Sequence, residues 1–198
     1  TNAISQSSVS SATFTEGILF SEEQLELNED WDDLRDMIQD NLLEAGVSEK
    51  YTRGLAGYLY AVYLNNVPLL LAGPCSEEIA DAFCTALSGR LAGRLCLDGD
   101  YCRLIVEQCF DSKDQVVVIE HPFHNAWSRY LPEIFNDKSK FYIAVSPYKE
   151  DLLLEPVSLF SYVAPLLTEY FVDKFPGRNF IRGYKKFSDF CKIPLKPY

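Results

Sequence analysis

The fold is decided by the stretch VPLLLAGPCSEEIADAF, residues 67–83. Its first part, Val67–Ala72, is continuously apolar and has the length of a strand buried on both faces, as central parallel strands are. A Gly-Pro pair ends this run, and Ser76 with the two glutamates after it is typical of the first turn of a helix. The stretch therefore predicts a central strand, a tight turn and a helix.

Apolar runs and amphipathic segments continue to alternate on both sides of this stretch. Such alternation indicates βαβ units with a mainly parallel sheet, and right-handed crossovers place helices on both of its faces. We therefore predict an α/β fold, a three-layer αβα sandwich preceded by two N-terminal helices. Gly54 and Gly57 in the second of these helices would let another element approach closely. The expected strands are Val67–Ala72, Arg94–Asp98, Val116–Glu120 and Phe141–Val145. The expected helices are Glu29–Ala45, Ser48–Asn65, Ser76–Arg90, Tyr101–Phe110, Pro122–Phe135 and Asp151–Val172, the last of them interrupted near Pro156 and Pro165.

The composition divides the 198 residues into three parts. Residues 1–15 are rich in Ser, Thr and Asn and predict a disordered leader. Residues 16–172 carry the α/β domain, and residues 173–198 form a basic, aromatic tail. The first residue is not Met, so we expect a fragment of a longer protein. No apolar run approaches the roughly 20 residues of a membrane helix and no secretory signal is present, so we predict a cytoplasmic protein with no membrane partner.

The net charge of −11 is unevenly distributed. Acids dominate Glu16–Lys50, and bases dominate from Asp173 onward. An acidic domain binds nucleic acid poorly, because affinity for the phosphate backbone comes largely from Lys and Arg. The tail is an exception, since bases and aromatics interleave in Phe175–Phe187 and such segments can bind single strands by charge and stacking. We favour the alternative that the tail folds back on the acid-rich N-terminal part.

The segment of residues 67–83 resembles the strand, phosphate loop and helix of AAA+ ATPases, a branch of the P-loop NTPases. The run VVVIEH, residues 116–121, lies where the Walker B strand ends in acids, so Glu120 and His121 are Walker B-like. The run FYIAVS, which ends at Ser146, lies where the next strand carries a polar sensor residue. The resemblance covers roughly residues 30–170 and implies a P-loop NTPase-like fold.

The residues that hold a nucleotide in that family are replaced in this chain. Counting from Gly73, the second glycine of the motif falls on Glu78. The lysine falls on Ile79 and the hydroxyl residue on Ala80. A bound phosphate would also meet Glu77, and like charges about 4 Å apart repel by roughly 1 kcal/mol even in water. We therefore expect no cofactor and no enzymatic activity. The degenerate phosphate loop comprises Gly73, Pro74, Cys75, Ser76, Glu77, Glu78, Ile79 and Ala80.

These features lead to one main hypothesis about function. A domain with the order of an ATPase but without its phosphate-binding groups suits a regulatory or scaffolding module of a larger protein. Its partner would be another protein or other domains of the same chain, and oligomers are plausible because such domains often associate.

An alternative hypothesis is a Mg²⁺-dependent phosphohydrolase. Asp98 and Asp100 follow a short strand and resemble the Asp-x-Asp of haloacid-dehalogenase phosphatases. With Glu120 they would meet at the carboxyl edge of the sheet, where ligands of α/β proteins bind. A turn capped by an aspartate is the simpler interpretation.

The cysteines and histidines offer further alternatives. Without a secretory signal, reduced and mostly buried thiols are expected rather than disulfides. His121 and His124 have a spacing that can bind zinc together with cysteines, although no C-x-x-C occurs. Cys75 precedes a helix and could pair with a histidine as a nucleophile, but the glutamates after it oppose a thiolate. The six cysteines are Cys75, Cys84, Cys96, Cys102, Cys109 and Cys191, of which Cys96, Cys102 and Cys109 are the zinc candidates.

Overall fold

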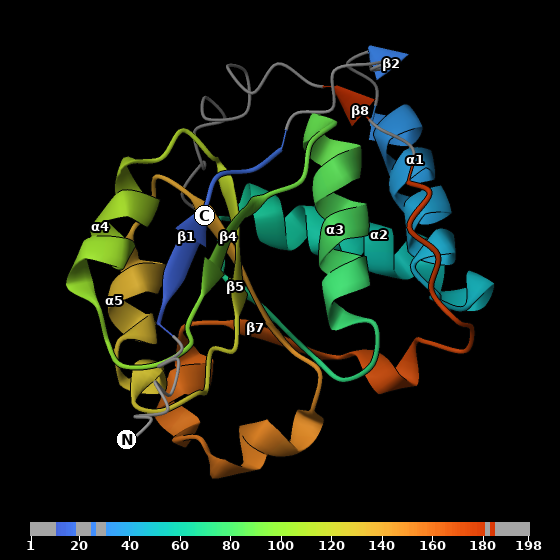
Figure 1. Cartoon of the computed structure of the whole chain (residues 1–198). Helices are drawn as coiled ribbons and strands as arrows, with labels where there is room; N and C mark the ends of the chain where they lie inside the picture. Colours follow the sequence, from blue (N-terminus) through green and yellow to red (C-terminus); the bar gives the residue numbers. More distant parts are fainter. Residues whose placement is uncertain (1–10, 19–24, 27–30, 181–182, 185–198) are drawn as a thin grey trace, which may run out of the picture.

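The computed structural model describes residues 11–18, 25–26, 31–180 and 183–184. Its centre is a six-stranded sheet in the order β1-β4-β5-β6-β3-β7 (Figure 1). Neighbouring strands from β4 to β7 pair in parallel, and only the edge strand β1 is antiparallel to its neighbour β4. The strands are β1 Thr13–Thr15, β3 Leu69–Ala72, β4 Gly93–Cys96, β5 Val116–Glu120, β6 Phe141–Ser146 and β7 Ala164–Leu167.

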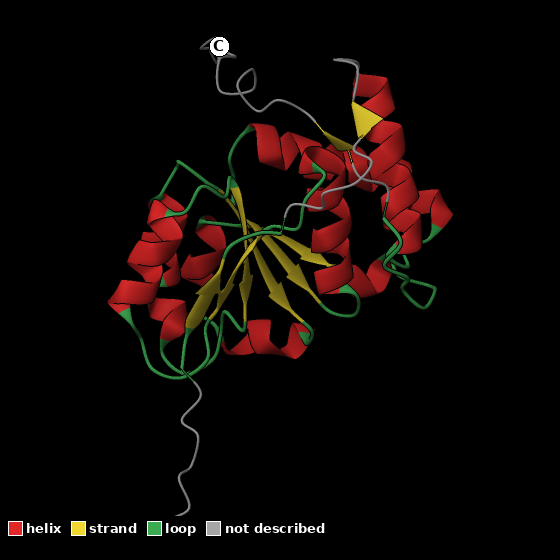
Figure 2. Ribbon diagram, turned by 45° about the horizontal axis from the view of Figure 1, so that its top comes forward, coloured by secondary structure: helices red, strands yellow, loops and turns green. Residues whose placement is uncertain are grey.

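Helices cover both faces of this sheet (Figure 2). Successive strand residues point to opposite faces, and Leu69 and Leu71 accordingly pack with the helices α1, α2 and α3. Leu70 and Tyr142 pack on the other face with α4 and α5. The fold is therefore α/β with three layers and a mostly parallel sheet. The helices are α1 Trp31–Glu44, α2 Glu49–Leu64, α3 Ser76–Ser88, α4 Arg103–Asp111 and α5 Leu131–Asn136.

The register of the parallel strands brings their carboxyl ends to one edge. Ala72 of β3 is opposite Ser146 of β6, and Cys96 of β4 is opposite Glu120 of β5. The four strands thus end in line, and the residues that follow them share this edge. The segment predicted to resemble a phosphate loop lies here, as do Cys96, Asp98 and His121.

Two of the predicted helices are wrong. In place of a helix over Pro122–Phe135, the chain makes a turn, the short 3₁₀ helix η1 (Trp127–Arg129) and α5. The backbone of His121 and Asn125 has positive φ angles of 55° and 51°, which interrupt any helix. The remaining error concerns Asp151–Val172, which contains η2 (Lys149–Leu154), η3 (Val157–Ser161), the strand β7 and η4 (Thr168–Tyr170).

The strand β7 was missed because Pro165 reads as a helix interruption. Proline lacks the N–H of a central strand, but it is tolerated on an edge strand. Among the residues that the structure describes, β7 is at the edge of the sheet and pairs with β3 alone, where Pro165 is opposite Leu70. The prolines of this segment therefore mark an edge strand and 3₁₀ turns rather than a broken helix.

Both ends of the chain contribute structure that the sequence did not predict. Strand β1 lies within the stretch expected to be disordered, while residues 1–10 of that stretch lie outside the described residues. Strand β2 (Leu25–Glu26) pairs in parallel with β8 (Gly183–Tyr184) from the tail. The expected aromatic tail beyond residue 184 lies outside the described residues.

The described part of the tail packs on the C-terminal end of α1. The amide of Asp173 donates to the carbonyl of Gly46 at 3.1 Å, and the amide of Gly177 donates to the carbonyl of Glu44 at 2.7 Å. This agrees with the interpretation that the tail folds back on the acid-rich N-terminal part. Phe180 packs against the core, whereas Phe175 is fully exposed.

Three smaller expectations can be compared with the structure. A Cβ added at Gly54 or Gly57 would meet nothing within 4 Å, so no described residue makes the close approach that these glycines would allow. The five described cysteines are free thiols, of which Cys84 and Cys109 are buried; Cys191 is outside the described residues. Within the described residues, no helix combines the length and the apolar character that crossing a membrane requires.

Candidate functional site

The loop after β3 is too short to wrap a phosphate. Helix α3 already begins at Ser76, the third residue after Gly73. The phosphate-loop motif places four variable residues and a second glycine before its lysine, so that successive backbone N–H groups can surround the anion. Here Gly73, with φ 118°, and Cys75, with φ 58°, turn the chain directly into the helix.

The space beside this loop is filled by groups of the chain itself. Thr168 is completely buried, and its hydroxyl donates to the carbonyl of Pro74 at 2.6 Å. A Cβ on Gly73 would lie 2.8 Å from the same Thr168 Oγ1. On the other side, the Ser76 hydroxyl and the Gly73 amide both donate to the carbonyl of Ser146, at 3.2 and 2.9 Å. The loop is therefore packed rather than open.

The residues at the start of α3 do not provide the groups that bind a phosphate in the resembled family. Glu78 forms an ion pair of 3.2 Å with Arg178 of the tail. Ile79 and Ala80, which occupy the places of the lysine and the hydroxyl residue, are fully buried in the core. Burial raises the pKa of the Cys75 thiol, and Glu78 raises it further, which opposes the nucleophile alternative at Cys75.

Glu120, the Walker B-like residue, is held by an arginine. Arg94 of β4 forms ion pairs with Glu120 and, through two short bonds of 2.6 and 2.8 Å, with Asp81 of α3. Burial raises the pKa of Asp81, while the Arg94 guanidinium opposes this change. Since one cation serves two carboxylates, Glu120 belongs to an internal ion network that links α3, β4 and β5.

Ser146, the sensor-like residue, is buried and turned toward its own chain. Its hydroxyl donates to a carboxylate oxygen of Asp151 at 2.8 Å. Its carbonyl accepts the two bonds from the β3–α3 loop described above. In this structure Ser146 therefore joins β6 to the start of α3 and to η2.

The carboxylates of the phosphohydrolase alternative are not brought together. Within the described residues, a single group of three metal-ligating side chains has its ligand atoms within 4.8 Å of one another, and it contains Cys96, Asp98 and His121. Neither Asp100 nor Glu120 belongs to it. Glu120 instead pairs with Arg94, so the described residues group Asp98 with Cys96 and His121 rather than with Asp100 and Glu120.

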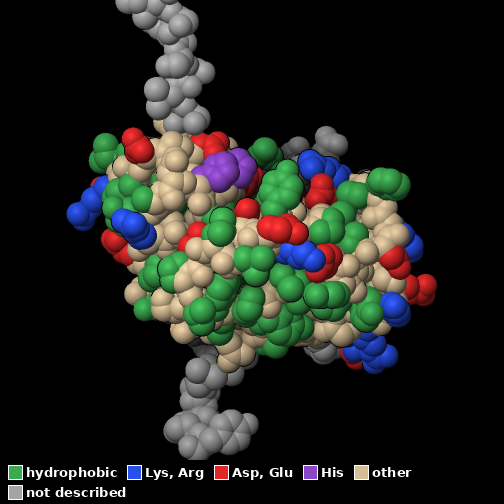
Figure 3. Space-filling model, turned by 90° about the horizontal axis from the view of Figure 1, so that it is seen from below, with side chains coloured by type: hydrophobic (Ala, Val, Ile, Leu, Met, Phe, Trp, Pro, Cys, Tyr) green, Lys and Arg blue, Asp and Glu red, His purple; other side chains and the backbone are tan. Residues whose placement is uncertain are grey.

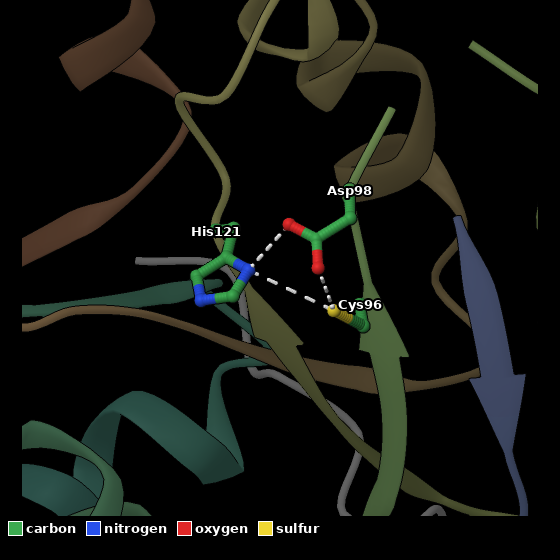
Figure 4. A group of neighbouring side chains, drawn as sticks. All are labelled: Cys96, Asp98 and His121. Atoms are coloured by element: carbon green, nitrogen blue, oxygen red, sulfur yellow. Dashed lines mark hydrogen bonds and ion pairs between the residues drawn. The ribbon is translucent and has the colours of Figure 1, made fainter. Parts of the chain in front are cut away.

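This ligand cluster of Cys96, Asp98 and His121 forms where β4 and β5 end (Figure 4). The Cys96 thiol donates to Asp98 Oδ2 at 3.4 Å, and its sulfur lies 3.7 Å from His121 Nδ1. His121 Nδ1 is 2.7 Å from Asp98 Oδ1. His121 follows the end of β5 with a positive φ of 55°, and its side chain points toward Cys96 of β4 and toward Asp98, which follows β4 (Figure 4).

A second histidine extends the cluster. The rings of His121 and His124 are stacked, with centroids 4.7 Å apart and an interplanar angle of 17°. His124 Nδ1 also lies 3.3 Å from Asp98 Oδ1. Burial acts to raise the pKa of Asp98, but the hydrogen bonds from Cys96 and His121 outweigh it, so this pKa is lowered. Burial, and after it the nearby Asp98, raises the pKa of Cys96 to about 11. Of the predicted zinc residues, the structure thus combines Cys96 with His121 and leaves Cys102 and Cys109 out of the group.

The geometry of the ligand cluster does not suit a cysteine nucleophile. A nucleophile–histidine–acid relay uses the two different nitrogens of the imidazole, one for each partner. Here Cys96 and Asp98 both contact Nδ1 of His121. A thiol with a raised pKa is also a poor nucleophile. The atoms converge on one point instead of forming a chain.

A scan against protein-family models found no match for this chain, and a search of curated proteins found no similar one. A surface cavity of about 450 Å³ lies at the opposite, amino edge of the sheet, between the end of α2 and α5. The carboxyl edge is the usual ligand site of α/β folds, so the ligand cluster rather than this cavity lies in the expected place.

Sequence reasoning missed Arg94, Asp81 and Thr168. Arg94 offered a signal, because an arginine within a strand of a mostly buried sheet needs acidic partners when it is partly buried. Thr168 offered none, since its role depends on the position of η4 beside the β3–α3 loop.

Proposed function

We propose that this domain is a non-hydrolysing, NTPase-like module that acts through contacts with another protein. The observation that carries the proposal is the packed β3–α3 loop, where the Thr168 hydroxyl bonds to the carbonyl of Pro74 at 2.6 Å. A nucleotide site needs free N–H groups at this place. A fold whose phosphate site is filled by its own chain can still act through contacts of its surface with another protein.

The strand order supports the resemblance to P-loop NTPases. A sensor residue must reach the same phosphate as the loop and the Walker B acids, so its strand has to adjoin both of theirs. Strand β6, which ends in Ser146, lies between β3 and β5. The strand order of the chain thus supports a site of this kind, in which the polar groups bond to one another instead of to a phosphate.

A group of exposed apolar side chains supports the contact role. In the 3₁₀ segment between β6 and β7, Leu153, Leu154 and Val157 are 84%, 86% and 83% exposed. Tyr148, just before this segment, is 64% exposed. Apolar side chains that gather in this way mark protein interaction sites. The orange segment at the bottom of Figure 1 carries them, and Figure 3 shows apolar side chains gathered on the face that is seen from below.

The chemistry of the partner follows from charge. The chain has a net charge of −11, and the exposed Glu150 lies within the same 3₁₀ segment. Complementary charges across an interface favour association and exclude wrong partners. The surface therefore fits a protein with an apolar centre and a basic rim, and a second copy of this acidic chain fits less well.

The first test is thermal unfolding with ATP, ADP or GTP and Mg²⁺ near millimolar concentration. A ligand at about 100 times its dissociation constant stabilises by roughly 2.7 kcal/mol, which shifts the midpoint by very roughly 5–10 °C for a domain of this size. The expected result is no shift. A Mg²⁺-dependent shift of several degrees would overturn the proposal.

The second test immobilises the domain and measures how much of a partner protein it captures, with and without ATP. The double variant Leu153→Ser/Leu154→Ser should lose a partner that the wild type retains regardless of ATP. Leu104→Ser is the matched control, because Leu104 is 69% exposed but belongs to α4. Equal capture by all three proteins would show that the 3₁₀ segment is not the contact surface.

A further inference from the structure

Three donor atoms of different chemistry meet at the end of β4 and β5, apart from the packed loop. Cys96 and Asp98 come from the end of β4, and His121, 25 residues after Cys96, comes from the end of β5 (Figure 4). We propose that Cys96 Sγ, an Asp98 carboxylate oxygen and His121 Nδ1 bind one divalent transition-metal ion of the zinc class. This site is independent of the proposed protein contacts.

The spacings among the three side chains are close to those of a tetrahedral zinc site, although the carboxylate oxygen nearest to the sulfur is not the one nearest to the imidazole nitrogen. Zinc bonds of about 2.3 Å to sulfur and about 2.0–2.1 Å to nitrogen or oxygen place sulfur about 3.5 Å from the other ligands, which are themselves about 3.3 Å apart. Here Cys96 Sγ is 3.4 Å from Asp98 Oδ2 and 3.7 Å from His121 Nδ1. The oxygen nearest to Nδ1 is Oδ1, at 2.7 Å, so the carboxylate must turn and this distance must lengthen by about 0.6 Å before one oxygen has both tetrahedral spacings.

The donor set selects the class of metal. Thiolate and imidazole bind zinc and its first-row neighbours, whereas Mg²⁺ and Ca²⁺ require oxygen ligands. A thiolate and a carboxylate together neutralise the two charges of the ion. The proton of the Cys96 thiol leaves to solvent as the metal binds. Three protein ligands leave the fourth position to water.

The loops that carry these ligands are held in place before a metal arrives. Asn125 Nδ2 and Trp127 Nε1 both donate to the carbonyl of Gly99, at 2.7 and 3.1 Å. These bonds join the loop after β5 to the loop after β4, next to Asp98. His124 stacks on His121 and contacts Asp98, as partner groups do around metal ligands.

The cluster is accessible to an ion from solvent. The side chains of His121 and Asp98 are 39% and 31% exposed. In the view from below, the two histidines form a surface patch with acidic side chains beside it (Figure 3). Entry of an ion therefore requires no opening of the fold.

The test is a titration of the chelator-treated protein with CoCl₂, followed by displacement with ZnCl₂. A four-coordinate cobalt site with a thiolate ligand gives visible d–d bands and a near-ultraviolet charge-transfer band. The expected result is one equivalent of such cobalt in the wild type. Cys96→Ser should lose the charge-transfer band and weaken binding at least about 100-fold, because even outer partners of metal ligands change affinity 10–100-fold.

Cys102→Ser is the matched control, since Cys102 is also a partly buried free thiol but lies outside the cluster. It should bind cobalt like the wild type. His121→Asn and Asp98→Asn repeat the test at more exposed positions in case Cys96→Ser does not fold, as judged by circular dichroism. Asn is chosen at His121 because it tolerates a positive φ. A wild type without the charge-transfer band, or a Cys96→Ser protein that keeps it, overturns the proposal.

Discussion

The carboxyl edge of the sheet carries two contrasting regions, one beside β3 and one beside β4 and β5. Beside β3, the polar groups satisfy one another, and Thr168 and Ser146 close the loop that a sequence motif would mark as a phosphate site. Beside β4 and β5, Cys96, Asp98 and His121 direct three donor atoms toward one partly exposed point. The region that resembles a motif is thus filled by its own chain, whereas the region without a motif brings three atoms of the metal-ligating kind together.

Arg94 links these two regions, because it pairs with Asp81 of α3 and with Glu120 of β5, and its loss has the largest expected effect. Arg94→Met leaves Asp81 and Glu120 without their shared cation. Removing one partner of a buried ion pair costs about 3–5 kcal/mol, and because Arg94 is 25% exposed we expect a loss of about 2–4 kcal/mol in the free energy of unfolding. Urea unfolding measures this change.

The control for Arg94 is Arg103→Met. Arg103 pairs with Glu107 on the surface of α4, and its side chain is 78% exposed, so this change should leave the urea midpoint almost unaltered. If both variants have the same midpoint, the Arg94 network does not hold α3, β4 and β5 together.

The two regions also differ in how far the sequence predicts them. The strands β5 and β6 were predicted almost to the residue, because continuous apolar runs bounded by polar residues allow few other structures. The convergence of Cys96 with His121 depends on the register of β4 against β5, which no local pattern encodes. The filling of the β3–α3 loop depends on η4, which the sequence placed inside a long helix.

The second prediction concerns Gly73, at the packed loop. Gly73→Ala places a Cβ 2.8 Å from Thr168 Oγ1 on a residue with φ 118°. Both the strained backbone and the displaced hydroxyl destabilise, and we expect a loss of about 1–3 kcal/mol by urea unfolding.

Gly57→Ala provides the opposite case with the same chemical change. Gly57 lies within α2, where a Cβ meets nothing within 4 Å. Alanine should stabilise this helix by about 0.5–1 kcal/mol. Effects of equal sign at the two glycines would mean that the loop is not packed as described.

The third prediction concerns the ligand cluster without metal. Cys96→Ser and His121→Asn should each lower the free energy of unfolding by less than about 1 kcal/mol, because partly exposed polar contacts contribute little. Chelator-treated proteins compared by urea unfolding check this. A loss as large as that of Arg94→Met would give the cluster a structural role and erase the contrast with the packed loop.

The smallest expected effect is at Glu78. A variant at this residue tests whether charge repulsion or packing of the β3–α3 loop is the reason why we expect no phosphate to bind there. Glu78→Gln removes a carboxylate from the start of α3 and the ion pair of 3.2 Å with Arg178. An exposed pair of this kind contributes about 0–1 kcal/mol, so stability should hardly change. ATP with Mg²⁺ should still produce no thermal shift, because the chain enters α3 at Ser76 and Thr168 remains bonded to Pro74. A shift in Glu78→Gln alone would mean that repulsion, rather than packing, keeps phosphate out.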